Sequence, residues 1–184
     1  MTTPGVPWPR VAPAHGPVVL RAFDADDLPM AQELSTDPYV PLIGTLPPRA
    51  GPAEAAAWIA RQQDRWAEGA GFSFAIAEAG TSRAVGAVGL WLRDLPQGRA
   101  TAGYAVAPGA RGRGLAAAAL VAVTGFGWTI PQLHRVELHV EAWNTASVRT
   151  AERAGYLREG LLRSHTEIGG QRRDMLLFAA VRDG

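Results

Sequence analysis

The stretch from Gly109 to Val123, GARGRGLAAAALVAV, places three glycines and two arginines directly before a run of apolar residues. The run predicts a helix over residues 114–128, and residues 101–107 predict a strand that ends at the Pro-Gly pair. A helix N-terminus leaves about four backbone N–H groups unpaired and carries roughly half a positive charge. Glycines let such a backbone approach a ligand closely. The stretch therefore predicts a strand–loop–helix unit whose loop can hold an anion such as a diphosphate; an ordinary turn with solvated arginines is the alternative.

The rest of the chain alternates between strand and helix patterns. Strands are predicted at 18–23, 72–77, 84–91, 101–107, 135–143, 156–163 and 173–181, and helices at 26–35, 53–69, 114–128 and 145–154. This order, βααβββαβαββ, predicts an α/β (α+β) fold in which a mixed sheet carries helices on both faces of a single domain. Residues 37–52, with five prolines, are predicted to be a loop. Residues 1–16 are predicted to be a disordered lead-in to a domain over 17–184.

Composition excludes several classes of protein. A net charge of +1 argues against a protein that coats nucleic acid. Without cysteine there is no disulfide framework, thiolate metal site or cysteine nucleophile. His134 and His139 are five residues apart on a predicted strand, hence on opposite faces, so we expect no metal site. The apolar runs are too short to span a membrane, so we expect no membrane partner. The N-terminus lacks the apolar core of a signal peptide, so we expect a cytoplasmic protein.

Two well-known phosphate loops can be compared with this stretch. A Walker A loop requires lysine, and all 18 basic residues here are arginine. Residues 112–117, GRGLAA, satisfy the dinucleotide pattern G-x-G-x-x-A, which keeps a nicotinamide-dependent enzyme as an alternative. That pattern, however, opens the first unit of a repeated βαβ fold, whereas several other elements come first here.

A third loop fits better, because R-x-x-G-x-A at Arg111–Ala116 resembles the acyl-CoA loop of the GNAT acyltransferase superfamily. Other family motifs occur in the same order: Leu20-Arg21, Gly103-Tyr104, Asn144-Thr145-Ala146-Ser147, Ala154-Gly155-Tyr156 and Glu159-Gly160-Leu161-Leu162-Arg163. The resemblance covers about Val18 to Val181. Within the superfamily, the motifs are most similar to those of the ribosomal-protein-alanine N-acetyltransferases.

The resemblance implies where coenzyme A binds. Its diphosphate is expected on the backbone of the loop, at Arg111, Gly112, Arg113, Gly114, Leu115 and Ala116. Its pantetheine arm is expected along the strand end at Ala105, Val106 and Ala107, where the family's two central parallel strands, here 101–107 and 135–143, splay apart. Asn144 is expected to bind the pantetheine, and Ser147 to contact coenzyme A as the acid for the departing thiolate. Helix capping is the alternative role for Asn144 and Ser147.

The sequence leaves several candidates for the groups that donate a proton to the thiolate and accept one from the amine. Many GNAT enzymes have a tyrosine seven residues after the asparagine, where this chain has Ala151, so either Ser147 or no protein acid serves the thiolate. Strand alternation places Glu137, His139 and Glu141 on one face, and we predict that His139 or Glu141 takes the amine's proton through water. Satisfied polar contacts are the alternative. His165 and Asp174 are further candidates, and Tyr39, Trp58 and Trp66 either line a pocket for the acceptor amine or pack in the core.

These features predict an N-acetyltransferase that transfers an acetyl group from acetyl-CoA, without a metal, to a primary amine by direct attack in a ternary complex. The amine is left open between a protein N-terminus, a peptide and a small molecule, and an acyl group other than acetyl also stays open. A non-catalytic acyl-CoA-binding sensor is the alternative. A homodimer is plausible from the apolar content, 47% of the chain.

Overall fold

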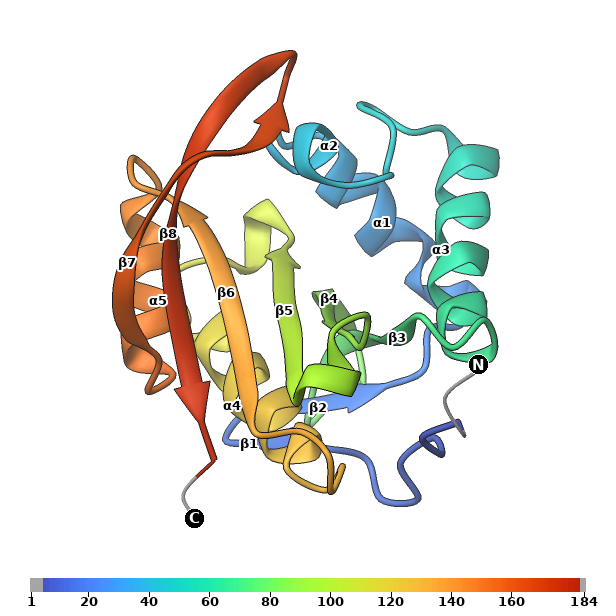
Figure 1. Ribbon diagram of the computed structural model, residues 1–184. Coiled ribbons are helices and arrows are strands. Elements are labelled where there is room, and N and C mark those ends of the chain that lie inside the picture. The colour runs from blue at the N-terminus through green and yellow to red at the C-terminus, as the bar shows by residue number, and fades with distance from the viewer. Residues whose placement is uncertain (1–4, 183–184) are drawn as a thin grey trace.

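A computed structural model describes residues 5–182 of the 184-residue chain (Figure 1). Its strands are β1 (Ala14–His15), β2 (Val18–Arg21), β3 (Gly71–Glu78), β4 (Ala84–Trp91), β5 (Arg99–Val106), β6 (Arg135–Glu141), β7 (Leu157–Ile168) and β8 (Gln171–Val181). They form one sheet in the order β1-β2-β3-β4-β5-β6-β8-β7. The helices are α1 (Leu28–Ser35), α2 (Val40–Ile43), α3 (Pro52–Ala67), α4 (Leu115–Gly127) and α5 (Thr145–Arg153). The single α/β domain with a mixed sheet is therefore confirmed.

Helices cover both faces of the sheet, and each face has its own core (Figure 1). On one face α4 packs on the aromatic residues of β3, with the rings of Phe126 and Phe72 4.7 Å apart. On the other, α1 and α3 enclose a smaller core in which Phe23 meets Trp58 at 5.6 Å. Because α4 is apolar on nearly its whole circumference, it can be stable only when buried in this way.

The two central parallel strands separate shortly after they begin. β5 and β6 pair only from Arg99 opposite Arg135 to Thr101 opposite Glu137, and then diverge (Figure 1). Each strand stays paired on its other side, β5 with β4 and β6 with β8. The predicted splay is therefore present, and it opens toward the loop that precedes α4.

Two predictions about irregular segments were wrong. Residues 5–16, predicted to be disordered, run along the sheet: β1 pairs with β2, and the ring of Trp8 lies 4.9 Å from that of Phe74. Trp66 also donates a hydrogen bond to the carbonyl oxygen of Val6. Val6 and Trp8 complete the cover that α4 gives to β3, and this burial outweighs the preference of the prolines for an open chain. Residues 1–4 lie outside the described residues, and the predicted loop at 37–52 contains α2.

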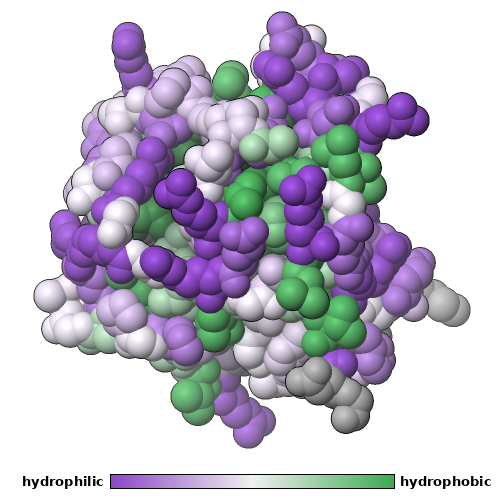
Figure 2. Space-filling view, turned by 90° about the vertical axis from the view of Figure 1, so that its left-hand side faces the viewer, coloured by the Kyte–Doolittle hydropathy of each residue, from purple (hydrophilic) through white to green (hydrophobic). Residues whose placement is uncertain are grey.

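The side of the molecule formed by β7 and α5 is largely hydrophilic (Figure 2). β7 is an edge strand, and its exposed charged residues are Arg158, Glu159, Arg163 and Glu167. Charged side chains on an edge strand prevent its open backbone groups from pairing with other chains.

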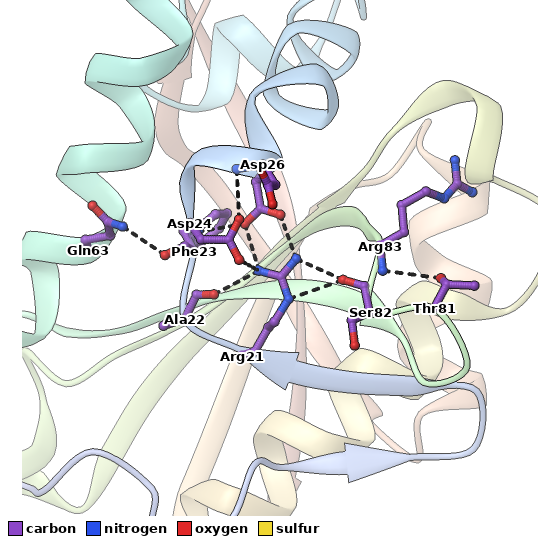
Figure 3. A network of polar contacts seen from close by, with 10 residues as sticks. Arg21, Ala22, Phe23, Asp24, Asp26, Gln63, Thr81, Ser82 and Arg83 are labelled. Atoms are coloured by element: carbon purple, nitrogen blue, oxygen red, sulfur yellow. Dashed lines mark hydrogen bonds and ion pairs between the residues drawn. The ribbon is translucent and has the colours of Figure 1, made fainter.

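Arg21, at the end of β2, connects three segments (Figure 3). Its guanidinium donates to the two carboxylate oxygens of Asp27 at 2.7 and 2.9 Å, and to the carbonyl oxygen of Ser82 at 2.9 Å. Asp27 is almost fully buried and also accepts a hydrogen bond from the amide of Asp24. The network fixes the β3–β4 hairpin and the start of α1 against β2.

Replacing Asp27 with asparagine is expected to lower the free energy of unfolding by about 3 kcal/mol, because the partly exposed guanidinium of Arg21 loses its buried counter-ion. Breaking a buried ion pair typically costs about 3–5 kcal/mol. The loss should stay near the lower end of this range, because Asp24 Oδ2 also lies 3.1 Å from Arg21 Nη1 and keeps part of the charge compensated. Urea unfolding measures the change. Asp26→Asn is the control: Asp26 is exposed, and the change should stay within about 0.5 kcal/mol. Equal losses in the two variants would show that the buried pair does not stabilise the fold.

Candidate active site

The loop between β5 and α4 presents unpaired backbone donors. Gly112 and Gly114 have φ values of 76° and 75°, in the left-handed region that favours glycine. The first helical hydrogen bond of α4 runs from the amide of Ala118 to the carbonyl oxygen of Gly114. Within residues 5–182, no hydrogen-bond partner is found for the six successive amides from Gly112 to Ala117. Six successive donors at a helix N-terminus form an arrangement that binds anions.

Carboxylates from three other segments contact this loop. Arg111 Nη2 lies 2.7 Å from Asp37 Oδ2, and Arg113 Nη2 lies 2.5 Å from Glu78 Oε1. The amide of Gly109 donates to Glu33 Oε1 at 2.6 Å. The hydrogen bond from Arg113, followed by that from Arg83, lowers the pKa of the Glu78 carboxyl. The loop arginines are therefore held in place by acidic partners.

The strand end at Ala105–Ala107 borders the splay. The amide of Ala107 donates to the carbonyl oxygen of Val85, on β4. Because backbone groups alternate in direction along a strand, the amide of Val106 points instead into the gap toward β6. The carbonyl oxygen of Val106 accepts a hydrogen bond from Arg111 Nε at 3.0 Å. On the same strand the hydroxyl of Tyr104, which sequence reasoning did not single out, is buried without a hydrogen-bond partner among the described residues.

The predicted polar face of β6 is present. Val136, Leu138 and Val140 are buried in the core beneath α4 and α5, so the side chains of Glu137, His139 and Glu141 project from the opposite face. Glu141 is only 4% exposed, and its Oε1 lies 3.6 Å from Arg173 Nε. Its negative charge is therefore compensated by a cation on the neighbouring strand β8.

His139 meets a second histidine. Its ring lies 4.7 Å from the ring of His165, and its Nε2 lies 4.0 Å from Glu137 Oε2. Burial, and then the neighbouring His165, lower the pKa of His139, which the weaker attraction of Glu137 opposes. An irregularity in β7 between residues 162 and 166 carries His165 to this position, and Asp174 stabilises it by accepting the Ser164 amide at 2.6 Å.

Two aromatic residues stand beside Glu141. Tyr39, from the segment before α2, contacts Trp143 edge-to-face with ring centroids 5.0 Å apart. Burial, and then the nearby Glu141 carboxylate, raise the pKa of the Tyr39 phenol well above its usual value. Trp58 and Trp66 pack elsewhere, against Phe23 and Trp8. Trp143, 60% exposed, was not singled out from the sequence, although it directly follows the polar face of β6.

The start of α5 shows helix capping. Asn144 Oδ1 accepts the amide of Ser147 at 3.1 Å, which is the alternative role considered for this residue. The hydroxyl of half-buried Ser147 has no hydrogen-bond partner in the part of the chain that the structure describes. Ala151 is fully buried in the core, so the position of the family's tyrosine holds only a methyl group.

Residues 5–182 contain no cluster of three histidine, cysteine, aspartate or glutamate side chains that could hold a metal ion. In the same range, no helix combines the length and the apolar character that crossing a membrane requires.

Known proteins resemble this chain over most of its length. Residues 18–157 match the family model described as "Acetyltransferase (GNAT) domain". The "Uncharacterized N-acetyltransferase p20" of Bacillus licheniformis is 27% identical over 165 residues, 90% of this chain and 93% of its own. The structure of Mycobacterium smegmatis RimJ in complex with CoA-disulfide is 27% identical, with a TM-score of 0.75, and the match covers 93% of this chain and 84% of that one. RimL, described as a ribosomal L7/L12 alpha-N-protein acetyltransferase in complex with coenzyme A, has the same fold at 16% identity, with a TM-score of 0.75 over 94% and 98% of the two chains.

Proposed function

Because the chain belongs to the GNAT acetyltransferase family and is an acyl-CoA-dependent N-acetyltransferase, we propose that it acetylates the α-amino group at a protein or peptide N-terminus. The amine attacks the thioester of acetyl-CoA directly, within a ternary complex. The observation that supports coenzyme A binding most strongly is the row of six unpaired amides from Gly112 to Ala117. It lies where the family motif places the diphosphate.

The pantetheine arm is proposed to enter the splay between β5 and β6. The amide of Val106 points into this gap, and the Tyr104 hydroxyl on the same strand has no partner within residues 5–182. Buried donors without partners cost free energy, and an amide-containing ligand can satisfy them. Ala105 and Ala107 are proposed to contact the pantetheine arm without hydrogen-bonding to it, because the amide of Ala107 is already bonded within the sheet.

The charges of the site favour an acceptor with a single amine. Three carboxylates near the splay have an arginine partner: Asp37 with Arg111, Glu137 with Arg135 and Glu141 with Arg173. A polyamine is bound best by several uncompensated carboxylates, and the charges of these three are compensated. Leu42, Ile43 and Trp143 are instead exposed apolar side chains, roughly half or more accessible, on the segments next to Tyr39. Such side chains suit the residues that follow the α-amino group of a peptide.

His139 is proposed to accept the proton of the amine, directly or through water, while the carbon–sulfur bond breaks and the thiolate leaves. An α-amino group has a pKa of about 8 and a thiol one of about 8.5, so neither proton transfer is demanding near neutral pH. The lowered pKa of His139 keeps its imidazole neutral and able to accept a proton. Ser147 is proposed to donate to the thiolate. Most of the rate enhancement is then expected from positioning the two substrates.

Release of coenzyme A from acetyl-CoA tests the proposal across three groups of amines. The first is a set of peptides with free N-termini, the second the same peptides with blocked N-termini and an internal lysine, and the third spermidine. We expect release with the first group only. Turnover of spermidine or of the blocked peptides would contradict the proposed acceptor. Binding of coenzyme A without release for any amine would favour an acyl-CoA sensor instead.

A further inference from the structure

One carboxylate joins the loop before α4 to the segment between α1 and α2. Asp37 Oδ2 lies 2.7 Å from Arg111 Nη2. Its other oxygen, Oδ1, accepts the amides of Tyr39 at 2.7 Å and Val40 at 2.9 Å. The side chain of Asp37 is 10% exposed, so the carboxylate is largely shielded from solvent, whereas that of Arg111 is 47% exposed. Burial disfavours the charged form, but the hydrogen bonds from Val40 and Arg111 outweigh it and hold the pKa of the Asp37 carboxyl below its usual value.

The segment that Asp37 holds carries Tyr39 to the opposite strand of the splay. The Tyr39 ring contacts the ring of Trp143, which directly follows β6, with centroids 5.0 Å apart, and the Glu141 carboxylate lies near enough to raise the pKa of the phenol. A continuous chain of contacts therefore runs from Arg111 through Asp37 and Tyr39 to Trp143. It begins at the loop proposed to hold the diphosphate and ends on the face proposed to receive the amine.

The second arginine of the loop has no such connection. Arg113 pairs with Glu78, whose other partners, Arg83 and Thr81, lie in the same β3–β4 hairpin. Two ion pairs of similar length and exposure thus hold the same loop, but only one of them also caps α2. This difference provides a matched control.

We propose that Asp37 is a positioning residue that couples coenzyme A binding to the order of the acceptor wall, residues 38–43. This inference rests on the proposed function, because it requires the diphosphate to bind the loop. A bound diphosphate fixes Arg111, Arg111 fixes Asp37, and Asp37 fixes the amides of Tyr39 and Val40. Linkage makes this coupling reciprocal: the factor by which coenzyme A strengthens binding of the acceptor equals the factor by which the acceptor strengthens binding of coenzyme A.

Amide hydrogen exchange of the acceptor wall, with and without saturating coenzyme A, tests the coupling. In the wild-type protein we expect coenzyme A to slow exchange of this segment about fivefold or more. Asp37→Asn keeps an oxygen that can accept the two amides, since asparagine caps helices as well as aspartate, but it removes the ion pair with Arg111. In D37N the slowing should disappear, while calorimetry still detects coenzyme A binding. In Glu78→Gln the slowing should persist.

The outcomes separate the two proposals. Coenzyme A binding to the wild type without slower exchange in the acceptor wall would overturn the coupling and leave the proposed function standing. The same slowing in D37N as in the wild type, or its loss in E78Q alone, would also overturn it. No coenzyme A binding at all would overturn both. With a peptide substrate, D37N should raise the KM for the peptide about tenfold and change kcat less, a pattern that a general loss of stability does not produce.

Discussion

Replacing Gly112 with aspartate is expected to weaken coenzyme A binding about 100-fold or more. Gly112 carries the first of the six unpaired amides, and a Cβ there would meet no atom within 4 Å, so the side chain fits. Its φ of 76° is a conformation that aspartate and asparagine tolerate better than other residues. A carboxylate about 5 Å from one phosphate charge costs about 3 kcal/mol at an effective dielectric constant of about 20. About 2.7 kcal/mol already corresponds to a 100-fold change in Kd.

Gly112→Asn provides the matched control, because asparagine has the same shape and backbone preference without the charge. Its Kd for coenzyme A, measured by calorimetry, should stay within about fivefold of the wild-type value, since only charge separates it from aspartate. The difference between the two variants should shrink at 1 M salt, where the screening length falls to about 3 Å. Equal weakening by both substitutions would mean that the diphosphate does not lie at this loop.

The loop and the splay could be predicted because their signals are local. The glycine pattern predicted a tight loop, in which Gly112 and Gly114 adopt positive φ values, and α4 begins at Leu115 close to where the apolar run predicted. The element order then fixed which two strands are parallel, and the family resemblance implied their divergence. The N-terminal segment was mispredicted because its prolines were given more weight than Trp8, whose partners Phe72 and Phe74 lie far away in the sequence.

The partners of the site residues could not be predicted from local patterns. Strand alternation placed Glu137, His139 and Glu141 on one face, but their neighbours Arg173, His165 and Tyr39 come from β8, β7 and the segment before α2. The position of His165 depends on a register shift in β7, which no periodicity indicates. Asp37 likewise appeared in the sequence as one of several acidic residues, and only the fold brings it to Arg111.

Replacing His139 with alanine is expected to lower kcat/KM for a peptide substrate about 100-fold at neutral pH, the low end of what a positioned base contributes. His139 must be neutral to accept a proton, and its pKa lies below the ordinary value of about 6.5 because burial and His165 disfavour the charged form. Activity through this group is therefore present above that lowered pKa and is lost as the pH falls through it. Glu137, which pairs with Arg135, only partly opposes the shift.

The pH–rate profile distinguishes this role from a structural one. The α-amino group of the peptide must also be neutral, so log(kcat/KM) of the wild-type enzyme should fall with a slope of about 1 below pH 8. The slope should steepen to about 2 below the pKa of His139, whereas His139→Ala should keep a slope of about 1 throughout. His134→Ala, an exposed histidine just before β6, is the control and should match the wild type. If His139→Ala keeps the slope of about 2 at low pH and loses less than about threefold in kcat/KM, another group accepts the proton of the amine. Glu141 would then be the next candidate.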